Sequence, residues 1–246
     1  MVFLLAFGSL ALSACGADES ETLSPSDSVE EFSSVDPAAS PRESLALHST
    51  EGRNETALQK HVTFFDRDND GVITLSDTYN GLRALGFGGV ASSGMAFAIN
   101  GALGSSTGAS WYAPFSIYVD QIHLGKHGSD TGIYDSNGDY VQSAFDDMFL
   151  NYDASQDGEL SEEEFEDLYE GQYTDSSGTS ASRAEFSILF SLASEVRLRE
   201  VEVYGSAWDG STEMETQEYS VLTRNTLERF YNGALFYELA GEPIPF

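Results

Sequence analysis

The sequence predicts a mainly α-helical fold, because apolar residues recur at helical spacing on both sides of two short acidic segments, residues 66–77 and 153–164. Both acidic segments have the length and the ligand spacing of an EF-hand calcium loop. The stretch between them carries a further apolar stripe that is typical of a helix. The predicted fold class is therefore a split EF-hand pair with a helical insertion between the two calcium loops, and with a short two-stranded bridge joining the loops.

The N-terminal segment predicts export. Residues 1–15 are mostly apolar or small, too short to cross a bilayer as a helix, and match a secretory signal peptide. The segment ends in Leu12-Ser13-Ala14-Cys15, which resembles the lipobox of bacterial lipoproteins, where cleavage before the cysteine leaves its thiol to carry a lipid. We therefore expect a protein that is lipid-anchored to the bacterial cell envelope through Cys15 and faces the periplasm or the exterior. An ordinary signal peptide with a chance cysteine is the alternative.

A polar tether is predicted to follow the signal peptide. Residues 16–56 are rich in serine, proline and acids, and ten acidic residues stand against two arginines. Such a composition buries too little apolar surface to offset the entropy of ordering the chain, so this acidic stretch is predicted to be disordered. The folded domain then covers residues 57–246.

The composition of the whole chain excludes several functions. The 11 Lys and Arg residues oppose 41 Asp and Glu residues, which gives a formal net charge of −30. The few basic residues are scattered, so nucleic acid is excluded as a partner. A single cysteine excludes an internal disulfide and a four-cysteine zinc or iron–sulfur site. The excess of carboxylates agrees with cation binding, and equally with a very soluble or salt-adapted surface.

Residues 66–77 fit a first calcium loop, with Gly71 at the sharp turn. Its predicted ligands stand at loop positions one, three, five, seven and twelve: Asp66, Asp68, Asp70, Val72 through its carbonyl, and Asp77. A bidentate glutamate is usual at the position of Asp77. Because the aspartate side chain is shorter, we expect this loop to bind calcium more weakly or to tolerate magnesium better.

Residues 153–164 are a more complete match, with Gly158 at the turn and a glutamate at the last position. The predicted ligands of this loop are Asp153, Ser155, Asp157, Glu159 and Glu164. EF-hand loops usually pair through their eighth residues, which are Ile73 and Leu160, so we expect these two residues to meet in the bridge. The alternative is that both segments are acidic surface loops that bind nothing.

Four blocks around the loops form a distinctive pattern that includes a histidine five residues ahead of the first loop. The blocks are residues 58–87, 114–118, 122–130 with the string Lys-His-Gly-Ser-Asp, and 230–236. Together they resemble the caleosins, a family also described as plant and fungal peroxygenases. The resemblance covers most of the chain from Leu58 to Leu239, and it is poor over residues 174–221.

The resemblance implies a haem enzyme that transfers an oxygen atom from a fatty-acid hydroperoxide to an unsaturated lipid or another apolar acceptor, with Ca²⁺ and haem b as cofactors. The two histidines that serve the haem in that family fall on His61 and His127. Imidazole is a good axial ligand for haem iron. One histidine is expected to be the proximal ligand, and the other a displaceable ligand or a distal acid–base group; the sequence leaves their order open. Because His61 lies on the helix that enters the first loop, we expect calcium to support haem binding.

The insertion departs from the plant caleosins, which carry a long apolar segment with a proline knot. Residues 88–112 are laced with Gly and Ser and contain no run of about 18 apolar residues, which excludes a membrane span. A buried or interfacial helix that lines the haem and substrate pocket is favoured over a lipid-inserting one. Further along, residues 186–192 predict a core helix, and residues 195–204 alternate in the manner of a strand.

A competing prediction is a non-enzymatic calcium-binding surface lipoprotein with a structural or adhesion role. It requires the same two loops and the same lipid anchor, but no haem. Haem absorbance therefore distinguishes the two predictions.

Overall fold

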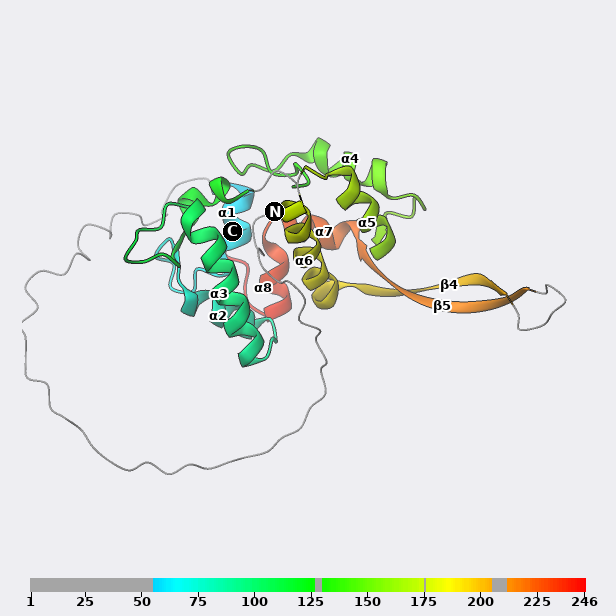
Figure 1. The fold of residues 1–246 in the computed structure, drawn as a ribbon, viewed down its shortest axis with the longest axis horizontal. Helices are drawn as coiled ribbons and strands as arrows, with labels where there is room; N and C mark the ends of the chain where they lie inside the picture. The colour runs from blue at the N-terminus through cyan, green and yellow to red at the C-terminus, as the bar shows by residue number, and fades with distance from the viewer. Residues whose placement is uncertain (1–54, 127–129, 175, 205–211) are drawn as a thin grey trace, which may run out of the picture.

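The computed structural model describes residues 55–126, 130–174, 176–204 and 212–246, and it is mainly helical, as the sequence predicts (Figure 1). The first half of the fold holds α1 (Ala57–Thr63), β1 (Val72–Ile73), α2 (Leu75–Ala84), α3 (Gly89–Ser106), β2 (Ile117–Tyr118) and the 3-10 helix η2 (Val119–Gly125). The second half holds α4 (Gln142–Tyr152), β3 (Glu159–Ser161), α5 (Glu162–Gly171), α6 (Ser176–Ala193), β4 (Glu195–Tyr204), β5 (Thr212–Thr223) and α7 (Arg224–Tyr231). The last helix is α8 (Ala234–Ala240).

The two acidic segments do not join each other in a bridge, so that prediction was wrong. Strand β1 pairs with β2 and places Ile73 opposite Ile117, whereas β3 pairs with β5 and places Leu160 opposite Leu222. Each acidic segment thus finds its strand partner later in its own half of the chain. The prediction failed because neither partner segment carries the acidic pattern by which a loop is recognised in the sequence.

Helices α2 and α5 begin in the same way, immediately after the strands of the acidic segments. The hydroxyls of Thr74 and Ser161 accept hydrogen bonds from the backbone N–H of Asp77 and Glu164, three residues later. The carboxylates of Asp77 and Glu164 accept in return from the backbone N–H of the capping residues. These capping boxes satisfy N–H groups that the first turn of a helix leaves without partners, and so fix where each helix starts.

Helix α3 fills the insertion and packs against α2 (Figure 1). Its buried Asn100 donates from Nδ2 to the carbonyls of Ile73 at 3.0 Å and Phe115 at 2.8 Å. Its Oδ1 accepts from the hydroxyl of Thr78 at 2.7 Å. Asn100 therefore ties β1, α2 and the segment just before β2 together, and its burial is compensated by three hydrogen bonds. Within the described residues, no helix is long and apolar enough to span a membrane.

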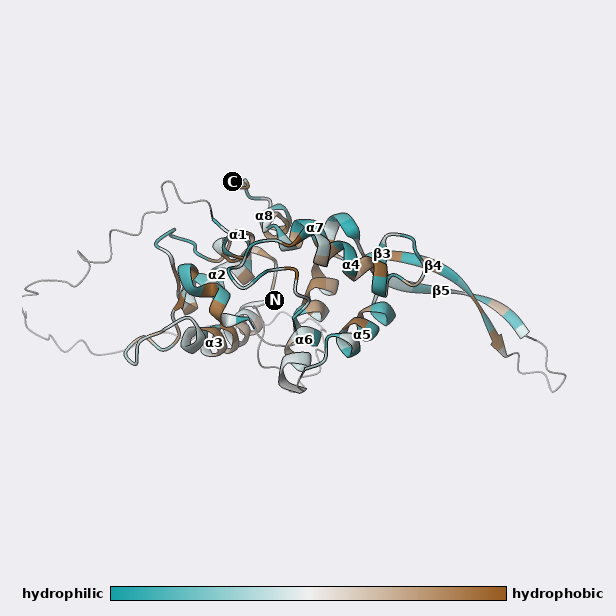
Figure 2. Ribbon diagram, turned by 90° about the horizontal axis from the view of Figure 1, so that it is seen from above, coloured by the Kyte–Doolittle hydropathy of each residue, from teal (hydrophilic) through white to brown (hydrophobic). Residues whose placement is uncertain are grey.

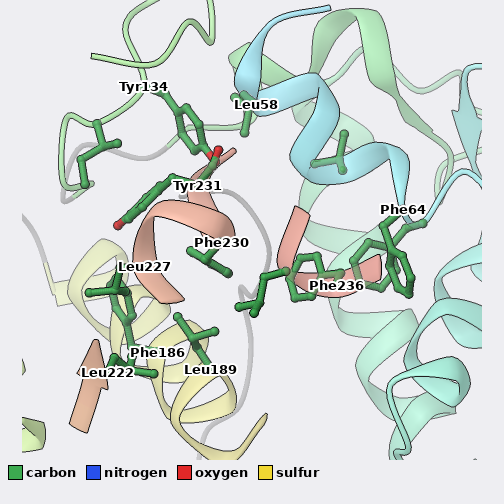
Figure 3. Packing of buried hydrophobic residues seen from close by; sticks show 14 of the residues in the cluster. Leu58, Phe64, Tyr134, Phe186, Leu189, Leu222, Leu227, Phe230, Tyr231 and Phe236 are labelled. Atoms are coloured by element: carbon green, nitrogen blue, oxygen red, sulfur yellow. The ribbon is translucent and has the colours of Figure 1, made fainter. Parts of the chain in front are cut away.

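The core joins the two halves through α7 and α8 (Figure 3). Tyr231 is fully buried and packs against Tyr134 with ring centroids 5.6 Å apart, while its neighbour Phe230 faces Phe186 of α6 at 6.5 Å. The carbonyl of Tyr231 also accepts a hydrogen bond from the Tyr134 hydroxyl at 2.7 Å. Aromatic residues from both halves thus enclose α7.

Strands β4 and β5 form a long antiparallel hairpin that projects away from the helices (Figure 1). The strand predicted over residues 195–204 is therefore confirmed, and α6 confirms the core helix before it. Strand β5 is mostly hydrophilic along the projecting part (Figure 2), and on β4 the side chains of Val196 and Leu198 are exposed. We refer to residues 195–204 and 212–220 as the hairpin arm.

Candidate functional site

The first acidic segment folds into a tight loop in which three predicted ligands converge. Carboxylate oxygens of Asp66, Asp68 and Asp70 all lie within 4.8 Å of one another. Asp66 accepts from the backbone N–H of Asp70 at 3.2 Å and of Gly71 at 2.9 Å, which curls the loop around its carboxylate. Among the described residues, no other three acidic, histidine or cysteine side chains bring their ligand atoms this close together. Such a cluster of hard oxygen donors suits Ca²⁺ or Mg²⁺.

Burial gives the Asp66 carboxyl an unusual pKa. The side chain is 7 % exposed, and desolvation raises its pKa to about 6, with further contributions from the nearby charges of Asp70 and Asp68. The pKa of Asp70 is raised as well, for the same main reason. A divalent cation placed among these groups would offset both the burial and the mutual repulsion of the carboxylates.

The second acidic segment repeats the backbone of the first. Asp153 accepts from the N–H of Asp157 at 3.2 Å and of Gly158 at 2.8 Å, which matches the two hydrogen bonds of Asp66. In the described chain, the two non-glycine residues with positive φ are Asn69 and Gln156, each at the fourth position of its loop. Gly71 and Gly158 follow at the sixth position with φ of +83° and +79°, a conformation that favours glycine.

The last predicted ligand of each loop, Glu164 or Asp77, has different hydrogen-bond partners. In the second loop, Oε1 of Glu164 crosses back to accept from the N–H of Ala154 at 2.9 Å, and the Ser155 hydroxyl donates to Asp153 at 3.1 Å. In the first loop, the hydrogen bonds of the Asp77 carboxylate go to Thr74 only, within its own capping box. Glu164 therefore reaches back to the start of its own loop, whereas Asp77 hydrogen-bonds only to the residue that caps helix α2. The other two predicted ligands of the second loop, Asp157 and Glu159, lie together on one short turn.

His61 lies on the buried face of α1, one turn before the first loop, and is 3 % exposed. Its Nδ1 donates to the carbonyl of Phe230 at 2.7 Å. Because a carbonyl oxygen only accepts, Nδ1 carries the proton and Nε2 keeps its lone pair. Burial lowers the pKa of His61 to about 4, so the ring is neutral at physiological pH. A neutral imidazole held through Nδ1–H is the usual form of a metal-ligating histidine.

Gly233 is the residue that lets α7 and α8 approach His61 so closely. Its φ is +88°, and a Cβ at this position would lie 2.6 Å from the backbone carbon of Lys60 and 2.7 Å from the backbone nitrogen of His61. Only glycine combines this conformation with this approach. The corner between α7 and α8 therefore places Phe230 and Phe236 against the imidazole, with ring centroids 4.7 and 5.1 Å away.

A cavity bounded by six helices opens onto His61. Its lining is apolar apart from His61 and Glu185, and comprises Phe65, Leu82, Leu85, Phe87, Met95, Ile99, Ile188, Leu189, Leu192, Phe230 and Phe236. Helix α3 contributes Met95 and Ile99, which agrees with the prediction of a helix that lines the pocket. The buried Glu185 is the lining residue that sequence analysis missed. Its position four residues before Leu189 on the apolar face of α6 was the available signal.

Two predicted residues, His127 and Cys15, lie outside the described residues. Close to His127 in the sequence, Lys126 and Asp130 form an ion pair at 3.1 Å. The hydroxyl of Thr131 lies 3.2 Å from the hydroxyl of Tyr231. Tyr231 follows Phe230, whose carbonyl accepts the hydrogen bond of His61. The described chain on the C-terminal side of His127 thus lies close to α7.

Fold and site together define a helical protein with two acidic glycine-containing loops and a buried histidine in an apolar cavity. The chain belongs to the caleosin family, since the family model described as "Caleosin related protein" matches residues 53–212. It is similar to "Probable peroxygenase 4" of Arabidopsis thaliana, with 36% identity over 159 residues, covering 63% of this chain and 82% of the relative. It is also similar to "Peroxygenase" of Lilium longiflorum, with 36% identity over 179 residues, covering 71% of this chain and 75% of the relative.

No solved structure matches the chain. The family and the two relatives support an oxidoreductase of the peroxygenase type.

Proposed function

We propose that the protein is a calcium-binding, haem-dependent peroxygenase that transfers oxygen from fatty-acid hydroperoxides to unsaturated lipids or other apolar acceptors. The observation that carries this proposal is the neutral, buried imidazole of His61, which is held by the Phe230 carbonyl and opens onto an apolar cavity. Apolar walls suit both a porphyrin and an acyl chain, because each buries apolar surface there.

The residues present fit a haem group in their chemistry. Hydrogen bonding through Nδ1 orients the ring of His61 and leaves Nε2 with the lone pair that an iron ligand needs. His127 is the proposed second histidine, as a displaceable ligand or a distal group. When bound, the haem would supply the oxygen-transfer chemistry. The protein's part is to hold the imidazole neutral, exclude water and orient the apolar substrate.

Haem absorbance tests this proposal directly. Protein produced with haem available should show a Soret band that shifts when cyanide is added. The band should fall strongly in His61→Ala and in His127→Ala, because each removes a histidine that is proposed to serve the haem. The matched control is His123→Ala, since His123 is half-buried on η2 and does not line the cavity. A colourless but folded and calcium-loaded wild type would instead favour the non-enzymatic calcium-binding surface lipoprotein.

We propose that both acidic loops bind Ca²⁺ in the EF-hand manner, the first more weakly or with more tolerance of Mg²⁺. The shared hydrogen bonds and positive φ angles of the two loops support this proposal. Calorimetric titration of the wild type should report two sites. Asp66→Asn and Asp153→Asn should each leave one site with the affinity of the wild type and weaken the other, and a wild type that takes up no calcium would contradict the proposal.

We also propose that the protein is exported and held at the cell envelope by a lipid on Cys15. The sequence before this residue supports the proposal through its apolar run and its small residues. In fractionated cells the wild type should sediment with membranes, and Cys15→Ser should shift to the soluble fraction. Equal partition of the two proteins would contradict a lipid anchor at this residue.

A further inference from the structure

Glu185 occupies the middle of an apolar helix face, where a glutamate is unusual. On α6, the residues before and after it at helical spacing are the buried Ala181 and Leu189. Glu185 itself is 6 % exposed. Removing a carboxyl group from water costs folding free energy even where the group has a partner. A residue with that cost, placed in a cavity, is a candidate for a functional role.

The cavity that Glu185 lines is the one that His61 lines. On the same turns of α6, Ile188 and Leu189 also face this cavity, so the side chain of Glu185 enters it from the wall formed by α6. Among the described lining residues, His61 and Glu185 are the two that can ionise. The site thus combines one imidazole and one carboxyl in apolar surroundings.

Other acid–base groups near the cavity are poor candidates for moving a proton. The phenols of Tyr134 and Tyr231 are buried, and desolvation together with the charge of Glu185 raises the pKa of each. Both phenols therefore stay protonated at physiological pH. His61 is tied through Nδ1 to Phe230, and its remaining nitrogen is the proposed iron ligand. Among the described residues that line the cavity, Glu185 is therefore the ionisable group that is not assigned to the iron, and its carboxyl group can accept and return a proton.

We propose that Glu185 is the catalytic acid–base residue that moves the proton of the bound hydroperoxide, an inference that rests on the proposed peroxygenase function. Its carboxylate takes the proton from the terminal O–H of the hydroperoxide. As the oxygen–oxygen bond breaks, the bonding pair stays with the oxygen attached to carbon, and Glu185 delivers the proton to that oxygen.

The hydroperoxide thus leaves as the corresponding alcohol. The terminal oxygen is the atom that the unsaturated acceptor receives, and two electrons of its double bond enter the new carbon–oxygen bonds. The hydroperoxide is reduced and the acceptor is oxidised by the same two electrons. No proton is gained or lost overall, which explains why one carboxyl group is sufficient. A group that transfers a proton in this way typically contributes about 100-fold or more to the rate.

The test uses the haem-loaded protein and the isosteric variant Glu185→Gln, which keeps the shape of the side chain but cannot exchange a proton. We expect an unchanged Soret band and a fall of about 100-fold in the rate of alcohol formation from a fatty-acid hydroperoxide. The control is Glu170→Gln, the same chemical change at an exposed position of α5, with an unchanged rate.

Ligand binding gives a readout that does not depend on turnover. Hydrogen cyanide must lose a proton to bind ferric haem, whereas carbon monoxide binds ferrous haem without proton transfer. We therefore expect Glu185→Gln to slow cyanide association and to leave carbon monoxide association unchanged. The second variant, Glu185→Asp, retains a carboxyl group and should recover part of the cyanide rate.

Three results would overturn the role of Glu185. These are a rate of alcohol formation in Glu185→Gln within about 3-fold of the wild type, a loss of haem from this variant, or an equal slowing of cyanide and carbon monoxide binding. The last two results would make the residue structural. A wild type that takes up no haem would instead overturn the proposed function itself, and that outcome is visible before any variant is made.

Discussion

The two acidic loops have the same backbone but belong to different structural surroundings. The loop of residues 66–77 follows the helix that carries His61, and its strand pairs with the two-residue β2 inside the body of the protein. The loop of residues 153–164 pairs through β3 with the root of β5, which continues into the hairpin arm. One local pattern is thus joined to the cavity in the first half and to a projecting arm in the second. We infer that cation binding has a different consequence in each half.

The largest effect is expected where the second half touches α1. Gly233→Ala should destabilise the protein by about 3 kcal/mol, because the new Cβ would meet the backbone of Lys60 in a left-handed conformation. It should also displace the imidazole of His61 and lower haem uptake. Thermal or urea unfolding measures the first effect, and the Soret band measures the second.

The matched control for this change is Gly241→Ala. Gly241 also has a positive φ, +69°, but an added Cβ would have nothing within 4 Å. The control should therefore show only the backbone strain, about 1 kcal/mol. Equal destabilisation by the two variants would contradict the close packing of the α7–α8 corner on α1.

The next largest effect distinguishes the loops by their link to the haem site. Asp66→Asn should weaken calcium binding at the first loop by about 100-fold. It should also lower haem uptake, because the loop fixes the end of the helix that carries His61. Asp153→Asn should weaken the second site similarly and leave haem uptake unchanged. Calcium titration and the Soret band should be measured on both variants. An equal loss of haem in the two variants would contradict a specific link between the first loop and the haem site.

In the calcium-free protein, the charge of Asp66 is expected to destabilise the fold, so Asp66→Asn should have a favourable effect there. The pKa of Asp66 is raised from its usual value of 3.8 to about 6, so the folded state loses stability as the pH rises between these two values, where the carboxyl group ionises more readily in the unfolded chain. The stability of the calcium-free wild type should therefore fall as the pH rises towards about 6, and this group should add no further loss above that pH. Asp66→Asn removes the charge, so the fall should be smaller in that variant. Urea unfolding in chelator at several pH values measures it.

The sequence predicts those features whose causes are local, and fails where the partner is distant. Gly71 and Gly158 mark turns that depend only on the neighbouring residues, and the helices around both loops follow from their apolar spacing. The partners of Ile73 and Leu160 could not be predicted, because Ile117 and Leu222 stand in segments without acidic ligands, the second of them at the end of a hairpin.

The residues of the candidate site show the same difference between what the sequence predicts and what depends on distant partners. His61 could be predicted through the family resemblance, whereas Phe230, whose carbonyl accepts its hydrogen bond, is 169 residues away in the sequence. Glu185 escaped because a glutamate on a helix normally faces water. Calcium and haem binding stay predictions, and they rest on the geometry described above.

A smaller effect is expected from exchanging the last residue of each loop. Asp77→Glu lengthens the side chain by one methylene group, so that it can reach across its loop as Glu164 does. Calcium should bind the first loop about 10-fold more tightly, and the preference for calcium over magnesium should rise. The converse variant, Glu164→Asp, should weaken the second loop by a similar factor. Calorimetry that shows no change in either variant would remove the last residue as the source of the difference.

The smallest effect concerns the link between the second loop and the hairpin arm. Arg199 on β4 donates from two nitrogens to Glu163, both at 2.9 Å, and Glu163 is the residue before the last predicted ligand of that loop. The pair is exposed, so its removal should change the overall stability very little. Arg199→Ala should instead raise the calcium affinity of the second loop by less than about 5-fold, because a positive charge near the loop is lost. The first loop, whose strand pairs with β2 and not with a strand of the arm, should be unaffected. A titration in which both sites change equally would show that the two loops are coupled to each other and not to separate surroundings.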